Sequence, residues 1–427
     1  MESLHELTLT TLAYGGDALG RLDDGRAVFV PFGLPGERVR VRAVEEKRGH
    51  VRARLEEVLA PSPQRIEPRC RHFGACGGCH YQHMSYEAQL EAKAEILLDQ
   101  LRRIGRIESP PVGATVPSPE QWNYRNHVQF HLTGEGRLGY VHHAEASGVL
   151  PISECHLPEP PLNELWPQLE FEPGTEIERV SLRAGDELML VLESESPEPP
   201  EIEVEAGISV VHLFEEHPVV AAGAGQMRIE VLGRGFQVSA ASFFQVNTAM
   251  AARMVEHLMA RLPASAETIL DLYCGVGLFS AFLAPRARRL IGVESSPSAC
   301  EDFAANLDEF DHVELYEGPA EEVLPHLEAQ PEVVLVDPPR AGLGRGVLDA
   351  LVERKPRVLA YVSCDPSTLA RDARRLIDGG YALVEVTPFD LFPQTYHIES
   401  ISVFTTDNTD EIDGLMHSMR GRGVRDS

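Results

Sequence analysis

Residues 268–285 read TILDLYCGVGLFSAFLAP, and this stretch decides the fold of the C-terminal half of the chain. TILDLYC is a short apolar run typical of a buried strand, and GVGLFSAFLAP predicts a tight turn followed by a helix. Glycines at such a junction let a ligand approach the backbone, with the N-terminus of the helix beneath it. The junction therefore predicts a nucleotide-like ligand site at the end of a strand.

Strand patterns and helix patterns alternate around this junction. Helix-like segments at 249–262 and 297–310 are interleaved with apolar runs at 289–295 and 332–339. Alternation of this kind predicts a parallel, doubly wound sheet. We therefore expect an α/β domain over residues 236–427.

The rest of the chain predicts two further domains. Residues 1–60 contain about five short strand patterns separated by turn signals such as GGDALG and DDG, which indicates a small barrel of the oligonucleotide-binding (OB) kind. A Pro-rich stretch at 61–68 follows, and residues 110–235 carry further strand-like pieces between Pro-rich breaks. We expect residues 61–235 to form a β-rich middle domain.

The charge of the chain limits its partners. A formal net charge of -28 over 427 residues argues against a non-specific binder of polyanions, because phosphate contacts require Lys and Arg. Total charge does not exclude a local basic patch, and residues 37–54 contain seven basic and three acidic residues. On a strand of the predicted barrel, this run fits an RNA-binding face better than a merely solvated one.

Composition also predicts where the protein works. No apolar run approaches the roughly 18 residues that a membrane span requires. The N-terminus MESLHELTLT lacks the basic-then-apolar pattern of a signal peptide. An odd number of cysteines, 7, in a long chain argues against a secreted disulfide scaffold. We expect a cytoplasmic protein without membrane contact, and a monomer.

Several residues with reactive or ligand-binding side chains stand at predicted strand ends. Glu294 ends the strand after the glycine turn, where an acid can bond ribose hydroxyls, and Asp337 ends the next apolar run. Cys364 ends the run RVLAYVSC, and Glu399 begins the last strand, HIESISVF. Ligands bind at the carboxyl edge of such sheets. A thiol there, just before a helix near Pro366, reads as a nucleophile, because a helix N-terminus stabilises a thiolate.

The glycine turn and the following Glu294 resemble class I S-adenosylmethionine-dependent methyltransferases. Nearly the whole chain resembles the uracil-C5 RNA methyltransferase family, which makes 5-methyluridine. The motifs that carry the resemblance are FFQVN (243–247), DLYCGVG (271–277), GVES (292–295), VDPPRAG (336–342), SCDPSTLARD (363–372) and HIESI (397–401). The resemblance implies a Rossmann-like class I methyltransferase domain, with the N-terminal barrel as a TRAM domain.

The resemblance also implies roles for individual residues. Cys364 would be the nucleophile and Glu399 the base. The implied contacts to S-adenosyl-L-methionine come from Gln245, Tyr273, Glu294 and Asp337. In one place the chain departs from the family, since Gly318-Pro319 stands where a polar residue is common.

The chemistry of this reaction explains the residue types. Uracil C5 is a poor nucleophile, but attack of a thiolate on C6 turns the ring into an enolate that is nucleophilic at C5. C5 then takes the methyl group from the sulfonium, a base removes the C5 proton, and Cys364 is expelled. The target nucleobase must leave its stack to reach the pocket, where Gln245 or Asp337 could hold its edge.

A cysteine cluster predicts a metal group. Cys70, Cys76 and Cys79 lie within ten residues, whereas Cys155 lies far downstream. Four thiolates can bind Zn²⁺ or an iron–sulfur cluster, and three bunched ligands with one distant ligand fit a cluster better than zinc. The resemblance implies a 4Fe-4S cluster, as in the ribosomal-RNA branch of the family. Its expected role is structural, because the methyl transfer needs no electron.

Four hypotheses follow. The barrel and the four cysteines favour methylation of 23S rRNA, since the tRNA enzymes of this family generally lack both. A tRNA uracil-C5 methyltransferase is the first alternative. An amino-group nucleic-acid methyltransferase using the DPPR motif is the second, although such enzymes usually carry an aromatic residue where this chain has Arg340. The third is an iron–sulfur RNA-binding protein with an inactive fold, against which the Cys364–Glu399 pair argues.

Overall fold

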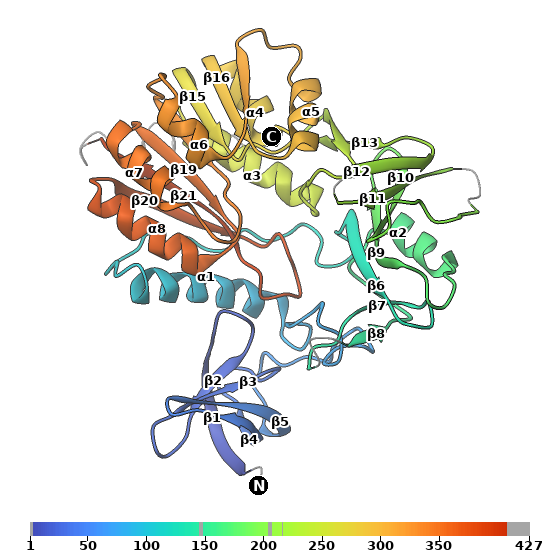
Figure 1. The fold of residues 1–427 in the computed structure, drawn as a ribbon. Helices are drawn as coiled ribbons and strands as arrows, with labels where there is room; N and C mark the ends of the chain where they lie inside the picture. The colour runs from blue at the N-terminus through green and yellow to red at the C-terminus, as the bar shows by residue number, and fades with distance from the viewer. Residues whose placement is uncertain (1–2, 145–147, 204–206, 216, 408–427) are drawn as a thin grey trace, which may run out of the picture.

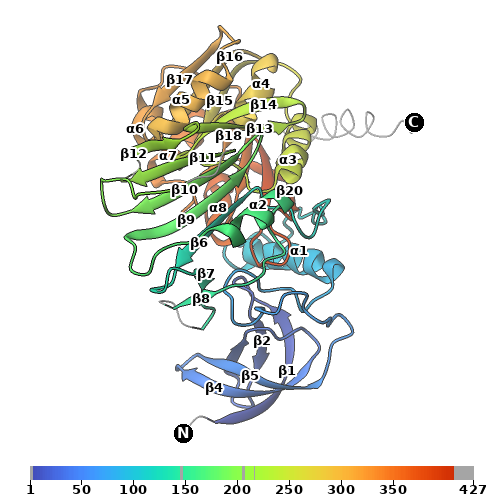
Figure 2. The same cartoon turned by 90° about the vertical axis from the view of Figure 1, so that its right-hand side faces the viewer.

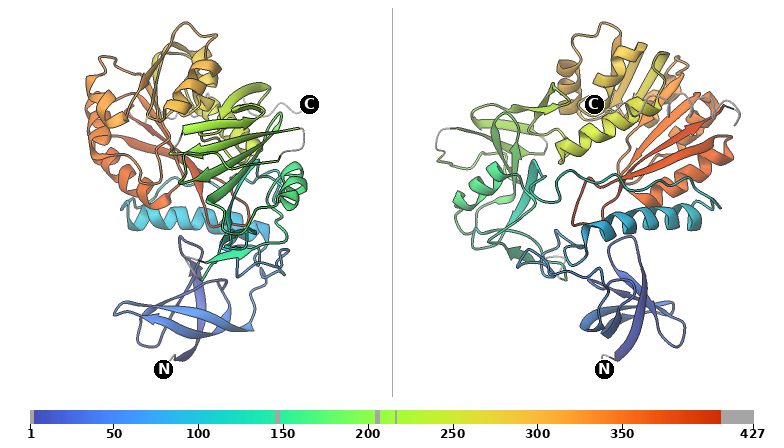
Figure 3. Two further views of the ribbon diagram at one scale, coloured as in Figure 1. Left: turned by 45° about the vertical axis from the view of Figure 1, so that its right-hand side comes forward. Right: turned by 180° about the vertical axis from the view of Figure 1, so that it is seen from behind.

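The computed structural model describes residues 3–144, 148–203, 207–215 and 217–407, which form three parts (Figure 1). A small barrel is followed along the chain by a β-sheet region and then by an α/β domain. Figure 3 shows helix α1 (Tyr86–Arg103) lying between the barrel and the α/β domain. The predicted fold class, with its small barrel and β-rich middle region, is confirmed.

The N-terminal barrel is closed, with strand order β1-β2-β3-β5-β4. Its strands are β1 (Leu4–Leu12), β2 (Ala18–Arg21), β3 (Ala27–Val30), β4 (Arg38–Glu46) and β5 (His50–Ala60). Side chains alternate along β4, so that Val39 and Val41 are fully buried in the barrel core. Arg40 and Arg42 lie on the opposite, outer face, as the two-residue period of a strand requires.

Ion pairs cover this outer face. Arg40 pairs with Glu6 at 2.7 Å and with Glu57 at 2.5 Å, and Arg42 pairs with Glu56 at 2.9 Å. The three glutamates lie outside the 37–54 window in which the basic surplus was counted, but strands β1 and β5 bring them beside the arginines. The surplus is therefore partly neutralised, and an RNA-binding role for this face stays a prediction.

The middle region is a seven-stranded sheet with the order β12-β11-β10-β9-β6-β7-β8 (Figure 2). Its strands are β6 (His127–Leu132), β7 (Leu138–Val141), β8 (Val149–Pro151), β9 (Ile177–Ala184), β10 (Leu188–Ser194), β11 (Ile208–Phe214) and β12 (His217–Ala222). Phe130, Leu182 and Trp166 belong to its own hydrophobic core. Trp166 follows the short helix α2 (Pro160–Leu165), which packs on β9.

The C-terminal sheet has seven strands in the order β17-β16-β15-β18-β19-β21-β20. The strands are β15 (Ala266–Leu272), β16 (Ala287–Glu294), β17 (Val313–Glu317), β18 (Val333–Val336), β19 (Val358–Ser363), β20 (Ala382–Phe389) and β21 (Glu399–Thr405). The helices between or beside them are α3 (Thr248–Arg261), α4 (Leu278–Leu283), α5 (Pro297–Asn306), α6 (Ala320–Val323), α7 (Arg345–Arg354) and α8 (Pro366–Asp378). Strands β15 to β19 run parallel to one another, and β18 and β19 are buried along their whole length. Burial on both faces explains why these strands read as continuous apolar runs.

Two elements outside the C-terminal sheet complete this domain. The hairpin of β13 (Gln226–Val231) and β14 (Arg234–Ser239) contributes Phe236 to the core shared with α3 and β15. Helix α1, which lies inside the predicted middle domain, packs instead against α8 and β20. Within the described residues, no helix is both long enough and apolar enough to cross a membrane.

Candidate active site

The order of the strands brings the predicted site residues to one edge of the C-terminal sheet. Strands β16, β15, β18 and β19 are neighbours in this order and run parallel. The residues at or just after their carboxyl ends are, in the same order, Glu294, Tyr273, Asp337 and Cys364. This edge is where ligands bind in open α/β sheets.

The last strand brings the predicted base to the predicted nucleophile. Strand β21 runs antiparallel to β19, so its first residue, Glu399, starts at the edge where β19 ends. Ser363 lies opposite Ser400, which places Cys364 and Glu399 at the open end of the same strand pair. The structure therefore brings together two residues that are far apart in the sequence.

The glycine turn after β15 is shaped for close packing. Gly277 has φ 88° and caps helix α4. A Cβ atom at this position would lie 2.4 Å from Cδ1 of Leu307 and 3.0 Å from Cδ2 of Phe303, so both conformation and space require glycine. Asp271, at the end of the strand, accepts a hydrogen bond from the Ser280 hydroxyl at 2.6 Å and holds α4 to β15.

Glu294 anchors two turns of the predicted cofactor site. Its carboxylate accepts hydrogen bonds from the backbone N–H of Gly275 at 2.9 Å, of Ser295 at 2.7 Å and of Ser296 at 2.8 Å. The side chain thus ties the end of β16 to the glycine turn. The predicted contact with ribose hydroxyls stays a prediction.

Two further predicted cofactor residues are Tyr273, which directly follows β15, and Gln245. Tyr273 has φ 63° and donates a hydrogen bond from its hydroxyl to Glu321 at 3.4 Å. Gln245 is partly buried, and its segment is held beside the start of α5 because Ser242 donates to Asp302 at 2.6 Å. Both placements are compatible with a cofactor at the sheet edge, and both contacts stay predictions.

The electrostatics around Cys364 differ from the prediction that a helix N-terminus stabilises its thiolate. Burial, followed by the charges of Glu399 and Asp337, raises the pKa of the Cys364 thiol to about 12, and Arg340 opposes this effect. The N-terminus of α8 is in addition occupied by Asp365, its N-cap. Its carboxylate already accepts the backbone N–H groups of Ser367 and Thr368, at 2.8 and 3.0 Å.

The carboxyl groups at this edge hold their protons more strongly than usual. Burial and then the charge of Asp337 raise the pKa of Glu399 to about 8, whereas Arg340 and Lys93 oppose the shift. Burial and then the charge of Glu294 raise the pKa of Asp337 to about 7. Carboxyl groups therefore crowd this edge, and a cationic ligand bound beside them would favour their ionised forms.

This shift predicts how stability depends on pH. The pKa of Glu399 rises from 4.5 in the unfolded chain to about 8 on folding, so the native state holds a proton that the unfolded chain has lost in this interval. The free energy of unfolding therefore falls as pH rises from about 4.5 to about 8. The variant Glu399→Gln has no ionisable group at this position. We therefore expect its thermal stability to fall less than that of wild type as the pH rises through this interval.

Melting curves by circular dichroism at both ends of the interval measure this difference. Glu353→Gln, an exposed position on α7, is the control and should follow wild type. An equal loss of stability in wild type and Glu399→Gln would contradict the raised pKa.

The sequence reasoning missed two residues at this site. Arg340 ends the DPPR motif and acts on the charges of both Cys364 and Glu399. Its place as the last residue of this motif was the only local indication of such a role. Tyr14 of the barrel donates a hydrogen bond from its hydroxyl to Asp365 at 3.0 Å, across 351 residues of sequence, and no local pattern indicates this contact.

The four predicted metal ligands lie in the same region of the structure. Cys79 and Cys155 belong to one small hydrophobic cluster, and Cys76 forms a backbone bridge to His142. Burial, followed by the charges of Cys155 and Cys70, raises the pKa of the Cys76 thiol to about 11. Among the described residues, no three His, Cys, Asp or Glu side chains form a group that could hold a metal ion.

Family comparisons cover most of the chain. The sequence profile described as tRNA (Uracil-5-)-methyltransferase matches residues 226–333 and 326–406, and the TRAM domain profile matches residues 5–55. An uncharacterized RNA methyltransferase of Thermosynechococcus vestitus is 34% identical, over 94% of this chain and 98% of its own length. Another from Aquifex aeolicus is 35% identical, over 93% of this chain and 97% of its own.

A solved structure has the same architecture. The Pyrococcus abyssi tRNA (uracil-54, C5)-methyltransferase, crystallised with S-adenosyl-L-homocysteine, is 26% identical and superimposes with a TM-score of 0.74. The match covers 95% of this chain and 100% of the Pyrococcus chain. Taken with the strand-edge site and the matching profiles, these relatives show that the chain belongs to the RNA (uracil-5-)-methyltransferase family.

Proposed function

We propose that this protein transfers the methyl group of S-adenosyl-L-methionine to C5 of uridine in RNA, with Cys364 as nucleophile and Glu399 as base. The observation that carries the proposal is the meeting of Cys364 and Glu399 at the sheet edge that also carries the glycine turn. A thiol and a carboxyl group with opposite tasks are what C5 methylation requires.

In the proposed mechanism, the sulfur of Cys364 forms a bond to C6 of the uracil, and the electron pair of the C5–C6 double bond moves into an enolate. C5 then attacks the methyl group, whose bond to the sulfonium sulfur breaks. Glu399 takes the C5 proton, the C5–C6 double bond forms again, and the bond between sulfur and C6 breaks. The site ends with its thiolate regenerated and one proton on Glu399.

The charges of the site match this sequence. The Cys364 thiol, with a pKa of about 12 in the free protein, must lose its proton before attack, and Arg340 is the nearby group that favours this loss. Glu399 accepts the C5 proton in its ionised form, and with a pKa of about 8 this carboxylate is a stronger base than that of an exposed glutamate. The acidic edge formed with Glu294 and Asp337 favours a sulfonium cation over a neutral product.

The surroundings of the four cysteines contain a buried cation. The Nε atom of Arg125 is buried without a hydrogen-bond partner, and the charge of Arg125 acts on both Cys79 and Cys155. An unpaired cationic donor there suits an anionic thiolate–iron group.

We therefore propose that Cys70, Cys76, Cys79 and Cys155 hold a 4Fe-4S cluster. When bound, this group supplies structural cross-linking, because no step of the methylation uses an electron. It joins the turns around Cys70 to the segment after β8, where the Arg71 N–H already donates to Glu154 at 2.8 Å.

We propose 23S rRNA as the target, with the protein acting as a cytoplasmic monomer. The barrel and the four-cysteine site support the ribosomal target. Transfer RNA is the second candidate, favoured by the similarity to the Pyrococcus abyssi enzyme, whose name gives uracil 54 of tRNA.

We expect the purified holoprotein to methylate a 23S rRNA transcript and not a tRNA transcript. The measurement is transfer of tritiated methyl groups, followed by mapping of 5-methyluridine by nuclease digestion and mass spectrometry. Methylation of tRNA alone would overturn the ribosomal target, and labelled product other than 5-methyluridine would overturn the reaction itself.

A further inference from the structure

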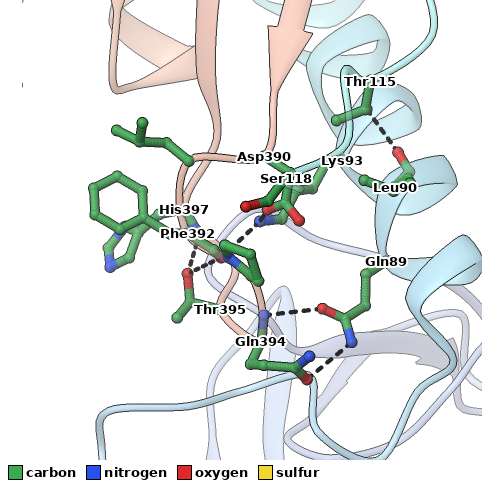
Figure 4. Close-up of polar contacts among 12 residues, drawn as sticks. Gln89, Leu90, Lys93, Thr115, Ser118, Asp390, Phe392, Gln394, Thr395 and His397 are labelled. Atoms are coloured by element: carbon green, nitrogen blue, oxygen red, sulfur yellow. Dashed lines mark hydrogen bonds and ion pairs between the residues drawn. The ribbon is translucent and has the colours of Figure 1, made fainter. Parts of the chain in front are cut away.

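One segment of the chain leads directly into the proposed base. Residues 390–398, here termed the base loop, join the end of β20 to Glu399, the first residue of β21. Figure 4 shows the face of α1 that meets this loop, with the side chains of Gln89 and Lys93 directed at it. Helix α1 therefore holds the segment that leads into Glu399, which itself pairs with Phe389 in the sheet.

Lys93 forms a fully buried ion pair with the base loop. Its Nζ atom lies 2.5 Å from Oδ1 of Asp390, and both side chains are 0% exposed. Nζ also donates to the carbonyl oxygen of Phe392 at 3.0 Å. A buried cation requires such partners, because an unpaired charge in the interior is strongly destabilising.

The choice of lysine at this position is specific. Only three of the 38 basic Lys and Arg residues are lysines, at positions 47, 93 and 355, so arginine is the ordinary cation of this chain. A compact ammonium group can donate to a carboxylate and a carbonyl in a closed site, whereas a planar guanidinium needs more room. The structure explains why position 93 keeps lysine.

A second contact holds the middle of the base loop. Gln89 donates from Nε2 to the side-chain oxygen of Gln394 at 3.0 Å, and accepts the Gln394 backbone N–H at 3.0 Å. Gln394 is buried and has φ 69°, a conformation that non-glycine residues rarely adopt. Its carbonyl oxygen accepts the backbone N–H groups of His80 and Tyr81, at 2.9 and 3.0 Å. The loop is thus fixed at both of these points.

We propose that Lys93 is a positioning residue of the methylation reaction, which anchors the base loop so that Glu399 can reach the C5 proton. The inference rests on the proposed function, because it requires Glu399 to be the base. Lys93 acts through its contacts with Asp390 and Phe392, its charge also opposes the rise in the pKa of Glu399, and it does not touch the substrate. Lys93 affects the last chemical step, in which Glu399 takes the C5 proton. Cys364, which follows β19, performs the first step.

The two steps can be separated experimentally. In RNA that contains 5-fluorouridine, no proton can leave C5, so adduct formation reports only the steps before proton removal. In ordinary RNA, slow proton removal makes the covalent RNA–protein complex accumulate. For Lys93→Met we expect turnover on ordinary RNA to fall about 10- to 100-fold with accumulation of the complex, because small misplacements of a catalytic group have effects of this size. Adduct formation with 5-fluorouridine RNA should stay within about twofold of wild type.

Two further variants complete the test. Lys93→Met/Asp390→Asn leaves no unpaired buried charge, so it folds if the single variant does not, and it should show the same accumulation. Lys355→Met, the same change at an exposed lysine, should behave as wild type. Wild-type turnover in the Lys93 variants, or a parallel loss of turnover and adduct formation in both, would overturn the inference. Absence of an adduct in wild type would instead overturn the proposed function.

Discussion

We expect Cys364→Ser to abolish methyl transfer, with a loss of at least about 10⁴-fold in turnover, as is typical when the nucleophile of a covalent mechanism is removed. The surroundings of this residue make the loss large. Burial and the charges of Glu399 and Asp337 raise the pKa even of the thiol to about 12. A serine hydroxyl, which ionises far less readily than a thiol, would stay protonated in this site.

Two measurements check this expectation. Tritium transfer to RNA measures turnover, and denaturing electrophoresis with 5-fluorouridine RNA detects the covalent adduct, which should be absent in Cys364→Ser. Cys300→Ser is the matched control, since Cys300 is another buried cysteine of the same domain and its Sγ atom contacts the carbonyl oxygen of Glu294 at 3.5 Å. Methyl transfer that survives in Cys364→Ser would favour the amino-group alternative, which needs no thiol.

The α/β domain and its edge residues could be predicted because their signals are local. Strands β18 and β19 are buried on both faces and therefore appear as short apolar runs, each ending at a residue with reactive chemistry. The parallel order then brings Asp337 and Cys364 together without further information. Glu399 was harder, because its place depends on β21 running antiparallel, and its predicted role as base came from the resemblance to the family.

The electrostatic predictions were weaker because they depend on residues distant in the sequence. The count of basic residues along β4 did not include the glutamates that β1 and β5 place beside the arginines of β4. The thiolate prediction for Cys364 treated the N-terminus of α8 as open, whereas Asp365 already caps it. A charge counted along the sequence says little about the field at a site, because the nearest charges come from other strands.

The packing of α1 could not be predicted at all. The helix occurs at Tyr86–Arg103 with Ser85 as its N-cap. Its pattern shows which face is apolar but not which element covers that face. A buried Lys93 on that face reads as an exposed charge until Asp390, 297 residues away, is placed beside it.

The second large effect concerns the last chemical step. We expect Glu399→Gln to lower turnover by about 10²- to 10⁴-fold, the usual contribution of a general base, while the covalent RNA–protein complex accumulates on ordinary RNA. An amide cannot accept the C5 proton, but it leaves the attack by Cys364 possible and removes one charge that raises the pKa of the thiol.

The variant Asp337→Asn tests which of two carboxyl groups, Asp337 or Glu399, acts as the base. Both have raised pKa values, about 7 for Asp337 and about 8 for Glu399, so the pKa alone does not assign the role. Strand position does not assign it either, because Asp337 follows β18 and Glu399 begins β21, and both of these strands pair with β19, which Cys364 follows. The resemblance to the family gives Glu399 the role of base and Asp337 a contact with the cofactor. We therefore expect Asp337→Asn to slow adduct formation without trapping the complex on ordinary RNA. Trapping by Asp337→Asn and not by Glu399→Gln would transfer the role of base to Asp337, and Lys93 would then anchor a loop that the chemistry does not use.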